Sequence, residues 1–156
     1  THGPLRAMSY HPNAEWLRRE GYDTNLAGCV HIPDARAFLE PEHYVKQPWA
    51  ILHELAHAMH HQVLGHDHPG IFAAWERLRS SGRWDRCLHI YGHEARHYAL
   101  TDPKEFFAEM TETYFGANDF FPFNRGELRR HEPEVEQLMR DIWERPWPAP
   151  LRPADD

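Results

Sequence analysis

The feature that most constrains this chain is an HExxH motif inside the stretch QPWAILHELAHAMHHQVLG, residues 47–65. Four residues are slightly more than one helical turn, so His53 and His57 share one face of a helix and can reach the same ion. Neutral imidazole suits zinc, and a third protein ligand would leave a fourth position open for a catalytic water. Glu54 follows His53 by about 100° of helix and therefore points beside the ion, where its carboxylate can take a proton from that water. The motif predicts a hydrolytic zinc site.

The residues around the motif favour a helix. The chain contains 14 histidines, so the five letters alone are moderate evidence and the context matters. Pro48 suits a first helical turn and Gly65 suits a helix end. We expect the motif to lie in the middle of this helix, largely surrounded by apolar residues, where a histidine pair without a partner would be costly. The apolar faces are expected from Ile51, Leu52, Leu55, Met59 and Val63.

A second helix is predicted from Pro103 to Gly116, and it offers the third ligand. Asp102 is a favourable N-cap, and Pro103 fits the first turn. Glu105 and Glu109 lie four residues apart on one face, a pairing of like charges that is weakly unfavourable unless cations lie nearby. We predict that Glu105 binds the metal and that Glu109 accepts a hydrogen bond from a ligand imidazole, which would fix the tautomer of that ring.

The remaining sequence predicts several short elements. They are helices at 14–20 and 69–79, a strand at 28–32, a β-hairpin within 87–100, a helix from about 133, and an extended proline-rich tail at 145–156. The strand is expected either to be an edge that holds an extended peptide beside the active-site helix or to be an ordinary core strand. The hairpin would carry Tyr98 on its return strand.

Length and charge limit the other possibilities. A chain of 156 residues suits a single domain, residues 1–156, with a real hydrophobic core. Its net charge of −7 and scattered basic residues argue against nucleic acids and anionic membranes as partners, and we expect a monomer. The first residues lack the apolar core of a signal peptide, and no apolar stretch is long enough to span a membrane. Cys29 and Cys87 allow either one disulfide or two thiols.

Three features together resemble the catalytic domain of the lethal-factor-like gluzincin metallopeptidases, a family that includes the anthrax toxin lethal factor protease domain and secreted Pro-Pro endopeptidases. They are HELAH at 53–57, Tyr98 seven residues before Glu105, and EFFAE at 105–109. The resemblance implies a compact α+β zincin-like domain. In such a domain a small mixed, mostly antiparallel sheet lies above the active-site helix, and the glutamate helix completes the metal site below.

The resemblance also implies roles for individual residues. Glu54 would be the general base, Tyr98 a phenol that stabilises the tetrahedral intermediate, and Glu109 a supporting residue. The expected function is zinc-dependent hydrolysis of peptide bonds in a peptide or protein substrate, in a secreted or extracytoplasmic protein. The implied zinc ligands are His53, His57 and Glu105.

Two other functions remain open at this point. Peptide deformylases also use HExxH but take a cysteine as third ligand, for which Cys29 is the upstream candidate, although the glycine-rich pattern of that family is not visible. A non-catalytic metal-binding protein is suggested by the density of histidines, but Glu54 argues for catalysis because zinc binding alone does not require it. The dense histidines are His57, His60, His61, His66 and His68.

Overall fold

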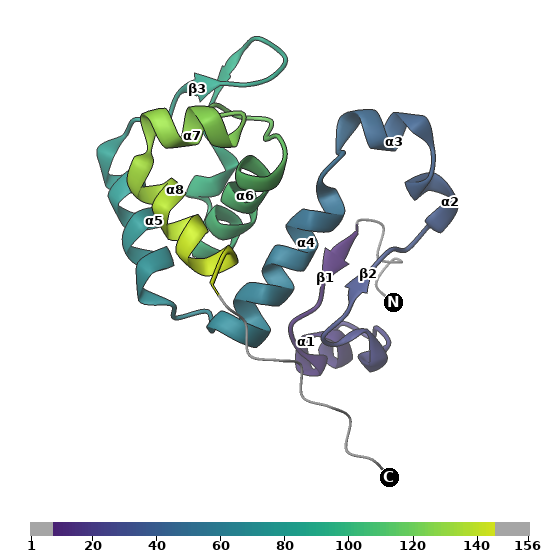
Figure 1. Cartoon of the computed structure of the whole chain (residues 1–156). Coiled ribbons are helices and arrows are strands. Elements are labelled where there is room, and N and C mark those ends of the chain that lie inside the picture. The colour runs from purple at the N-terminus through teal and green to yellow at the C-terminus, as the bar shows by residue number, and fades with distance from the viewer. Residues whose placement is uncertain (1–7, 146–156) are drawn as a thin grey trace.

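The computed structural model describes residues 8–145, apart from the side chains of His43, Tyr44 and Lys46. Within this range the chain has the expected α+β character, with many helices and a few short strands (Figure 1). The strands form two antiparallel pairs, β1 (Ser9–Tyr10) with β2 (Val30–His31) and β3 (Cys87–Leu88) with β4 (Glu94–Ala95). The α-helices are α1 (Ala14–Arg19), α2 (Ala35–Phe38), α3 (Pro41–Lys46), α4 (Ala50–Met59), α5 (Pro69–Ser81), α6 (Pro103–Phe115), α7 (Arg125–His131) and α8 (Pro133–Trp143). The shorter helical turns are 3₁₀ helices at Thr24–Leu26 and Tyr98–Leu100 and a π-helical turn at His60–Leu64.

The helices α5, α6, α7 and α8 pack into a helical body, and α4 runs along it beside α6 (Figure 1). Their facing sides enclose one apolar cluster, whose largest members, Phe106 and Phe107, are fully buried. Full burial of such a side chain stabilises a fold by about 1.5–3 kcal/mol relative to exposure. The predicted helix from about 133 is present as α8, and its inner face contributes Val135, Met139 and Ile142 to this cluster.

The helix that carries the predicted glutamates begins and ends where the sequence indicates. Asp102 caps α6 by accepting hydrogen bonds from the backbone N–H groups of Lys104 at 2.7 Å and Glu105 at 3.0 Å. A cap of this kind contributes about 1 kcal/mol. Pro103 occupies the first turn, and Gly116 follows the last helical residue.

Gly116 also allows α4 and α6 to approach each other closely. A Cβ atom at this position would lie 2.2 Å from the indole of Trp49, the residue that immediately precedes α4. Any side chain at position 116 would therefore displace the rigid indole ring. The contact fixes the start of one site helix against the end of the other.

The N-terminal part forms a thin layer on the other side of α4, made of α1, β1 and β2, with α2 and α3 farther along the chain (Figure 1). We refer to residues 8–48 as the N-terminal layer. β1 and β2 pair in the register Ser9 with His31 and Tyr10 with Val30. The buried side chains of this layer in the described range are Tyr10, His11 and Leu17.

The expectation of one small mixed sheet was wrong. The described strands form two separate two-stranded antiparallel sheets, and α4 lies between them (Figure 1). The hairpin of β3 and β4 is extended on one side by the segment after α6, through an isolated bridge between His89 and Phe120. Each sheet is built from local pairings on its own side of α4, so the helix prevents them from merging.

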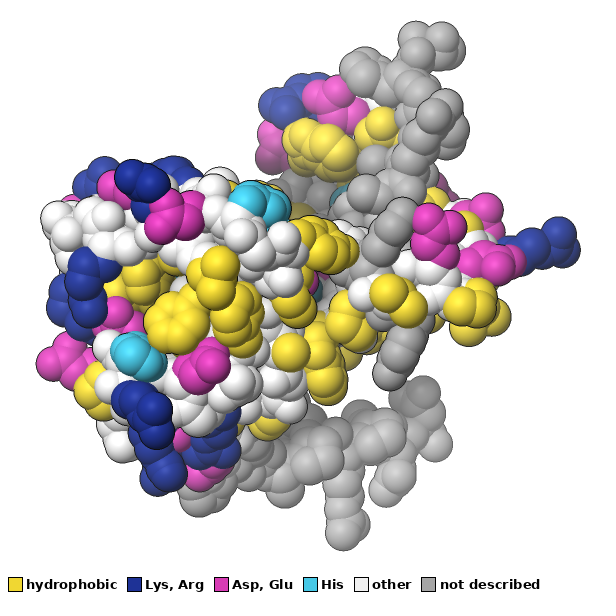
Figure 2. All heavy atoms as spheres, turned by 90° about the horizontal axis from the view of Figure 1, so that it is seen from above, with side chains coloured by type: hydrophobic (Ala, Val, Ile, Leu, Met, Phe, Trp, Pro, Cys, Tyr) yellow, Lys and Arg dark blue, Asp and Glu magenta, His cyan; other side chains and the backbone are white. Residues whose placement is uncertain are grey.

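The helix of the HExxH motif also differs from its prediction. It begins at Ala50, after Pro48, and it has no side-chain N-cap. Ile51 and Leu55 of this helix, and Val63 of the π-helical turn that continues it, were expected on apolar faces. All three side chains are exposed. The N-terminal layer is too thin to cover this face, and hydrophobic side chains gather where the helical body meets the rest of the molecule (Figure 2). The charged side chains of the helical body, by contrast, lie mainly along its outer rim in this view.

Several smaller features complete the comparison with the sequence. The strand expected at 28–32 is present but only two residues long, and α7 was not predicted. Trp16 of α1 is 40% exposed. Cys29 and Cys87 are not joined in a disulfide. Among the described residues, no helix combines the length and the apolar character needed to cross a membrane.

Candidate metal centre

α4 and α6 bring the three predicted metal ligands together. The Nε2 atoms of His53 and His57 lie 3.2 Å and 3.6 Å from the same oxygen, Oε2 of Glu105. An ion with tetrahedral ligands at about 2.0–2.1 Å requires ligand atoms about 3.3–3.4 Å apart. The observed spacing therefore fits a zinc ion. Two imidazole nitrogens and one carboxylate oxygen are also a donor set that zinc prefers.

The three side chains also influence each other's protonation. Burial alone would raise the pKa of Glu105, but hydrogen bonds from His53 and His57 outweigh it and lower the pKa to about 2. Burial would lower the pKa of His53, yet its bonds to Glu105 and Glu112 raise it to about 10. The carboxylates thus favour a positive charge at the position of the imidazoles. A metal cation would satisfy the same electrostatic demand.

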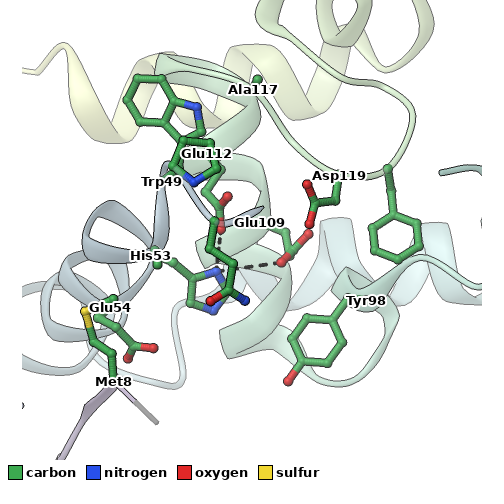
Figure 3. A pocket seen from close by; sticks show the side chains of 13 residues that line it. Met8, Trp49, His53, Glu54, Tyr98, Glu109, Glu112, Ala117 and Asp119 are labelled. Carbon is green, nitrogen blue, oxygen red and sulfur yellow. Dashed lines mark hydrogen bonds and ion pairs between the residues drawn. The ribbon is translucent and has the colours of Figure 1, made fainter. Parts of the chain in front are cut away.

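The opposite nitrogen of His53 faces a glutamate that the sequence analysis did not identify. Nδ1 of His53 lies 2.6 Å from Oε1 of Glu112, a hydrogen bond, and 3.6 Å from Oε1 of Glu109 (Figure 3). The prediction that Glu109 accepts the hydrogen bond of a ligand imidazole was therefore wrong for His53. The spacing could have revealed Glu112, since residues 105, 109 and 112 share one helical face.

Glu109 itself is held from another direction. Its Oε2 accepts a hydrogen bond of 2.8 Å from Nδ2 of Asn118, and the same amide donates to the Glu109 carbonyl at 3.1 Å. Burial, followed by the nearby charge of Glu112, raises the pKa of Glu109 to about 7. The pKa of Glu109 is thus shifted in the opposite direction from that of Glu105.

Glu54 lies where a strand of the N-terminal layer reaches the site. Its Oε2 accepts a hydrogen bond of 2.6 Å from the backbone N–H of Tyr10 in β1. The backbone hydrogen bonds from β1 toward β2 are made by the neighbours of Tyr10 in the chain, and not by Tyr10 itself. The N–H group of Tyr10 therefore points away from β2 and toward α4. The strand that presents its edge to the site is thus β1, and not the strand at 28–32 that the sequence suggested.

Tyr98 lies at the site but not on a strand. It begins the 3₁₀ helix that follows the hairpin, because His97 caps this turn by accepting a hydrogen bond from Ala99 N. The Tyr98 side chain is 49% exposed. Partial burial and the carboxylates of Glu105 and Glu109 raise the pKa of the phenol, which keeps it a hydrogen-bond donor at neutral pH.

A cavity of about 570 Å³ opens beside His53. Figure 3 shows Glu54 and Tyr98 on opposite sides of the His53 imidazole, with Asp119 farther along the wall. Of the three predicted metal ligands, His53 lines the cavity. The remaining lining residues are Met8, Gln47, Pro48, Trp49, Ala50, Glu109, Glu112, Ala117 and Phe120. The arrangement places the carboxylate of Glu54, the phenol of Tyr98 and the imidazole of His53 around one space.

The described residues offer little support for the two alternative sites. Within this range, the groups of three potential ligands that converge are His53, His57 and Glu105, and His53, Glu109 and Glu112. Neither group contains Cys29, the third ligand expected for a deformylase. The histidines that follow the motif are close in pairs, with rings of His60 and His66 centred 5.2 Å apart, but they do not form a third group.

The chain matches no protein-family model, and neither the curated proteins nor the solved structures with which it was compared gave a match.

Proposed function

We propose that this protein is a zinc-dependent endopeptidase with a zincin-like catalytic domain. The observation that carries the proposal is the convergence of His53, His57 and Glu105 on one point beside a cavity that Glu54 and Tyr98 also line. Metal ligands, a carboxylate that is not a ligand and a neutral phenol are the groups that metal-assisted hydrolysis of an amide requires. The resemblance of the motif spacing to lethal-factor-like gluzincins points to the same chemistry.

The mechanism divides the steps among the residues of the chain. His53, His57 and Glu105 would hold the zinc ion, which when bound would supply a Lewis acid for the water and the scissile carbonyl. Glu54 takes the proton of the attacking water and later delivers it to the leaving amine. Tyr98 donates its phenolic hydrogen to the oxygen that becomes negative in the transition state.

The substrate of this proposal is a peptide in extended conformation. β1 presents the edge that does not pair with β2 toward α4, and Met8, just before this strand, lines the cavity. A peptide strand that displaces the bond from the Tyr10 N–H to Glu54 can add to this edge through main-chain hydrogen bonds, which hold it independently of its sequence. The cavity wall would then contact the side chains next to the scissile bond.

A direct test combines metal analysis with a peptide digest. We expect the purified protein to retain one zinc per chain after dialysis and to cleave members of a peptide library, with products identified by mass spectrometry. Glu54→Gln should keep the zinc and lose roughly 10²–10⁴-fold in turnover, because an amide cannot accept the proton. Glu15→Gln, an exposed carboxylate of α1, is the matched control and should behave as the wild type.

Two results would contradict the proposal. A protein that holds no zinc, or one whose Glu54→Gln variant cleaves as fast as the wild type, does not use the proposed site. Cleavage restored by added zinc after chelation would exclude a contaminating metal-independent protease.

A further inference from the structure

The imidazole of His53 is held between two carboxylates of the same helix. Oε2 of Glu105 lies 3.2 Å from its Nε2, and Oε1 of Glu112 lies 2.6 Å from its Nδ1. Both glutamates are on the face of α6 that packs against α4, two helical turns apart. The two nitrogens of the ring therefore have separate and fixed partners.

Metal binding by Nε2 determines where the proton of the ring must be. A ring nitrogen that binds a metal carries no proton, so the proton of neutral His53 resides on Nδ1. The hydrogen bond at 2.6 Å then runs from Nδ1–H to the carboxylate of Glu112. A carboxylate in this position fixes the ring orientation and makes the opposite nitrogen a stronger donor to the metal.

Glu109 is not equivalent to Glu112, although it is closer in sequence to the metal ligand Glu105. Its distance of 3.6 Å from Nδ1 of His53 is beyond hydrogen-bonding range. Its carboxyl and its carbonyl are both bonded to the buried amide of Asn118. Asn118 in turn accepts a hydrogen bond from Phe120 N, so Glu109 attaches the segment 117–120 to α6. That segment contributes Ala117, Asp119 and Phe120 to the cavity wall.

We infer that Glu112 is the positioning residue of the metal centre and acts through Nδ1 of His53, whereas Glu109 anchors the cavity wall through Asn118. This assignment rests on the proposed function only in taking His53, His57 and Glu105 as the metal ligands. It does not depend on which substrate is cleaved. In this role Glu112 acts on the metal through His53 and does not bind the metal itself.

The test measures metal affinity, which requires no turnover. Zinc dissociation constants of the wild type, Glu112→Ala, Glu112→Gln and Glu109→Gln are determined by competition with a chromophoric chelator. Glu112→Ala should weaken zinc binding about 10–100-fold, the range typical for loss of such a carboxylate. Glu112→Gln should weaken it less, because an amide oxygen still accepts the Nδ1–H bond but lacks the charge. Glu109→Gln should stay within about threefold of the wild type, since it leaves the His53 partner intact.

Substitution with Co²⁺ gives a spectroscopic signature that a purely structural role would not change. The visible d–d bands of the cobalt protein should shift in both Glu112 variants, because the field of the His53 ligand changes, and should be unchanged in Glu109→Gln. The melting temperature of each metal-free variant serves as the folding control. If Glu112→Ala does not fold, Glu112→Gln carries the comparison.

The outcomes separate this inference from the proposed function. Wild-type zinc affinity in both folded Glu112 variants overturns the inference even if Glu54→Gln abolishes cleavage. A larger loss in Glu109→Gln than in Glu112→Gln overturns it as well. Selective weakening by the Glu112 variants in a protein that cleaves no peptide would support the inference and contradict the proposed function.

Discussion

The two sides of α4 are built in different ways. Toward the helical body, α4 adjoins a continuous apolar cluster, formed mostly by fully buried residues of α5, α6, α7 and α8. Toward the N-terminal layer, the contacts are largely polar. The Tyr10 hydroxyl accepts a hydrogen bond of 2.9 Å from Gln62 and lies 2.8 Å from Nδ1 of His61, while the Tyr10 amide donates to Glu54.

The two sides of α4 therefore contribute different parts of the site. The proposed metal ligand Glu105 and its neighbours Glu109 and Glu112 belong to α6, in the packed body, where dense packing fixes the position of each side chain. The edge of β1 belongs to the N-terminal layer, where few side chains are buried and local opening is less costly. We therefore expect a rigid metal centre and an adaptable substrate side.

The largest expected effect comes from opening a cavity in the packed body. Phe107 is fully buried and lies between the rings of Trp143, at 5.8 Å, and His60, at 5.3 Å. Phe107→Ala should lower the free energy of unfolding by about 3–5 kcal/mol, measured by urea denaturation, and should weaken zinc retention. Leu17→Ala, the matched change in the N-terminal layer, should cost about 2 kcal/mol, the low end for such substitutions, and leave zinc retention intact. Equal losses from the two variants would contradict the comparison.

The second effect concerns Tyr98, which comes from the packed side but is half exposed at the cavity. Its phenol should contribute in the transition state and little to the ground state, so Tyr98→Phe should lose about 3 kcal/mol of transition-state stabilisation, roughly a hundredfold in turnover. Zinc content, melting temperature and KM should change little. Tyr91→Phe, on the exposed tip of the hairpin, is the control.

Two results would change the role assigned to Tyr98. Turnover within about twofold of the wild type would make it only a lining residue. A parallel loss of zinc, stability and activity would make it a structural one.

The third effect is a pH dependence of stability on the packed side. His97 is buried between the rings of Trp84 and Phe120, and burial lowers its pKa from 6.5 to about 3. Between these values the unfolded chain binds a proton that the folded chain does not, so the stabilising contribution is complete above about pH 6.5 and is lost as the pH falls toward 3. At pH 5.5 one such group has lost about 1.4 kcal/mol.

A variant comparison isolates this contribution from other titrating groups. His97→Phe keeps a ring between Trp84 and Phe120 but cannot take up a proton. We expect the stability difference between the metal-free wild type and this variant to shift by about 1.4 kcal/mol, against the wild type, between pH 7.5 and pH 5.5. A difference that does not depend on pH would mean that the pKa of His97 is the same in the folded and the unfolded chain.

The sequence predicted the parts of the site that depend on local signals. The HExxH spacing, the Asp102 cap and the Gly116 stop together placed His53, His57 and Glu105 on two helices with the correct faces. α7 could have been predicted in the same way, because Asn124 caps it by accepting a hydrogen bond from Glu127 N.

The other features of the site depend on how the helices and layers pack against each other. The spacing of residues in the sequence does not determine this packing. Glu109 and Glu112 share a face, and only the crossing of α4 over α6 decides which of them reaches Nδ1 of His53. The exposure of Ile51 and Leu55 likewise follows from a thin N-terminal layer, not from the apolar pattern of α4. Tyr98 was expected on a strand because the apolar run around it resembles one. In the structure His97 caps a 3₁₀ helix that begins at Tyr98, so the strand ends before this residue.

The smallest expected effect tests whether the polar side is energetically separate from the metal centre. Gln62 donates to the Tyr10 hydroxyl at 2.9 Å and to the Gly28 carbonyl at 3.2 Å, which ties the π-helical turn after α4 to β1 and to the segment just before β2. Gln62→Ala should lower the free energy of unfolding by about 1 kcal/mol, since partly exposed hydrogen bonds are lost to water. Gln137→Ala, which removes an exposed bond to Asp141 within α8, should cost only a few tenths of a kcal/mol. Zinc affinity should be unchanged in both variants, because neither residue contacts a ligand or its carboxylate partner. A loss of zinc affinity in Gln62→Ala alone would show that the N-terminal layer helps to hold the metal centre, and the rigid and adaptable sides of α4 would then be one unit.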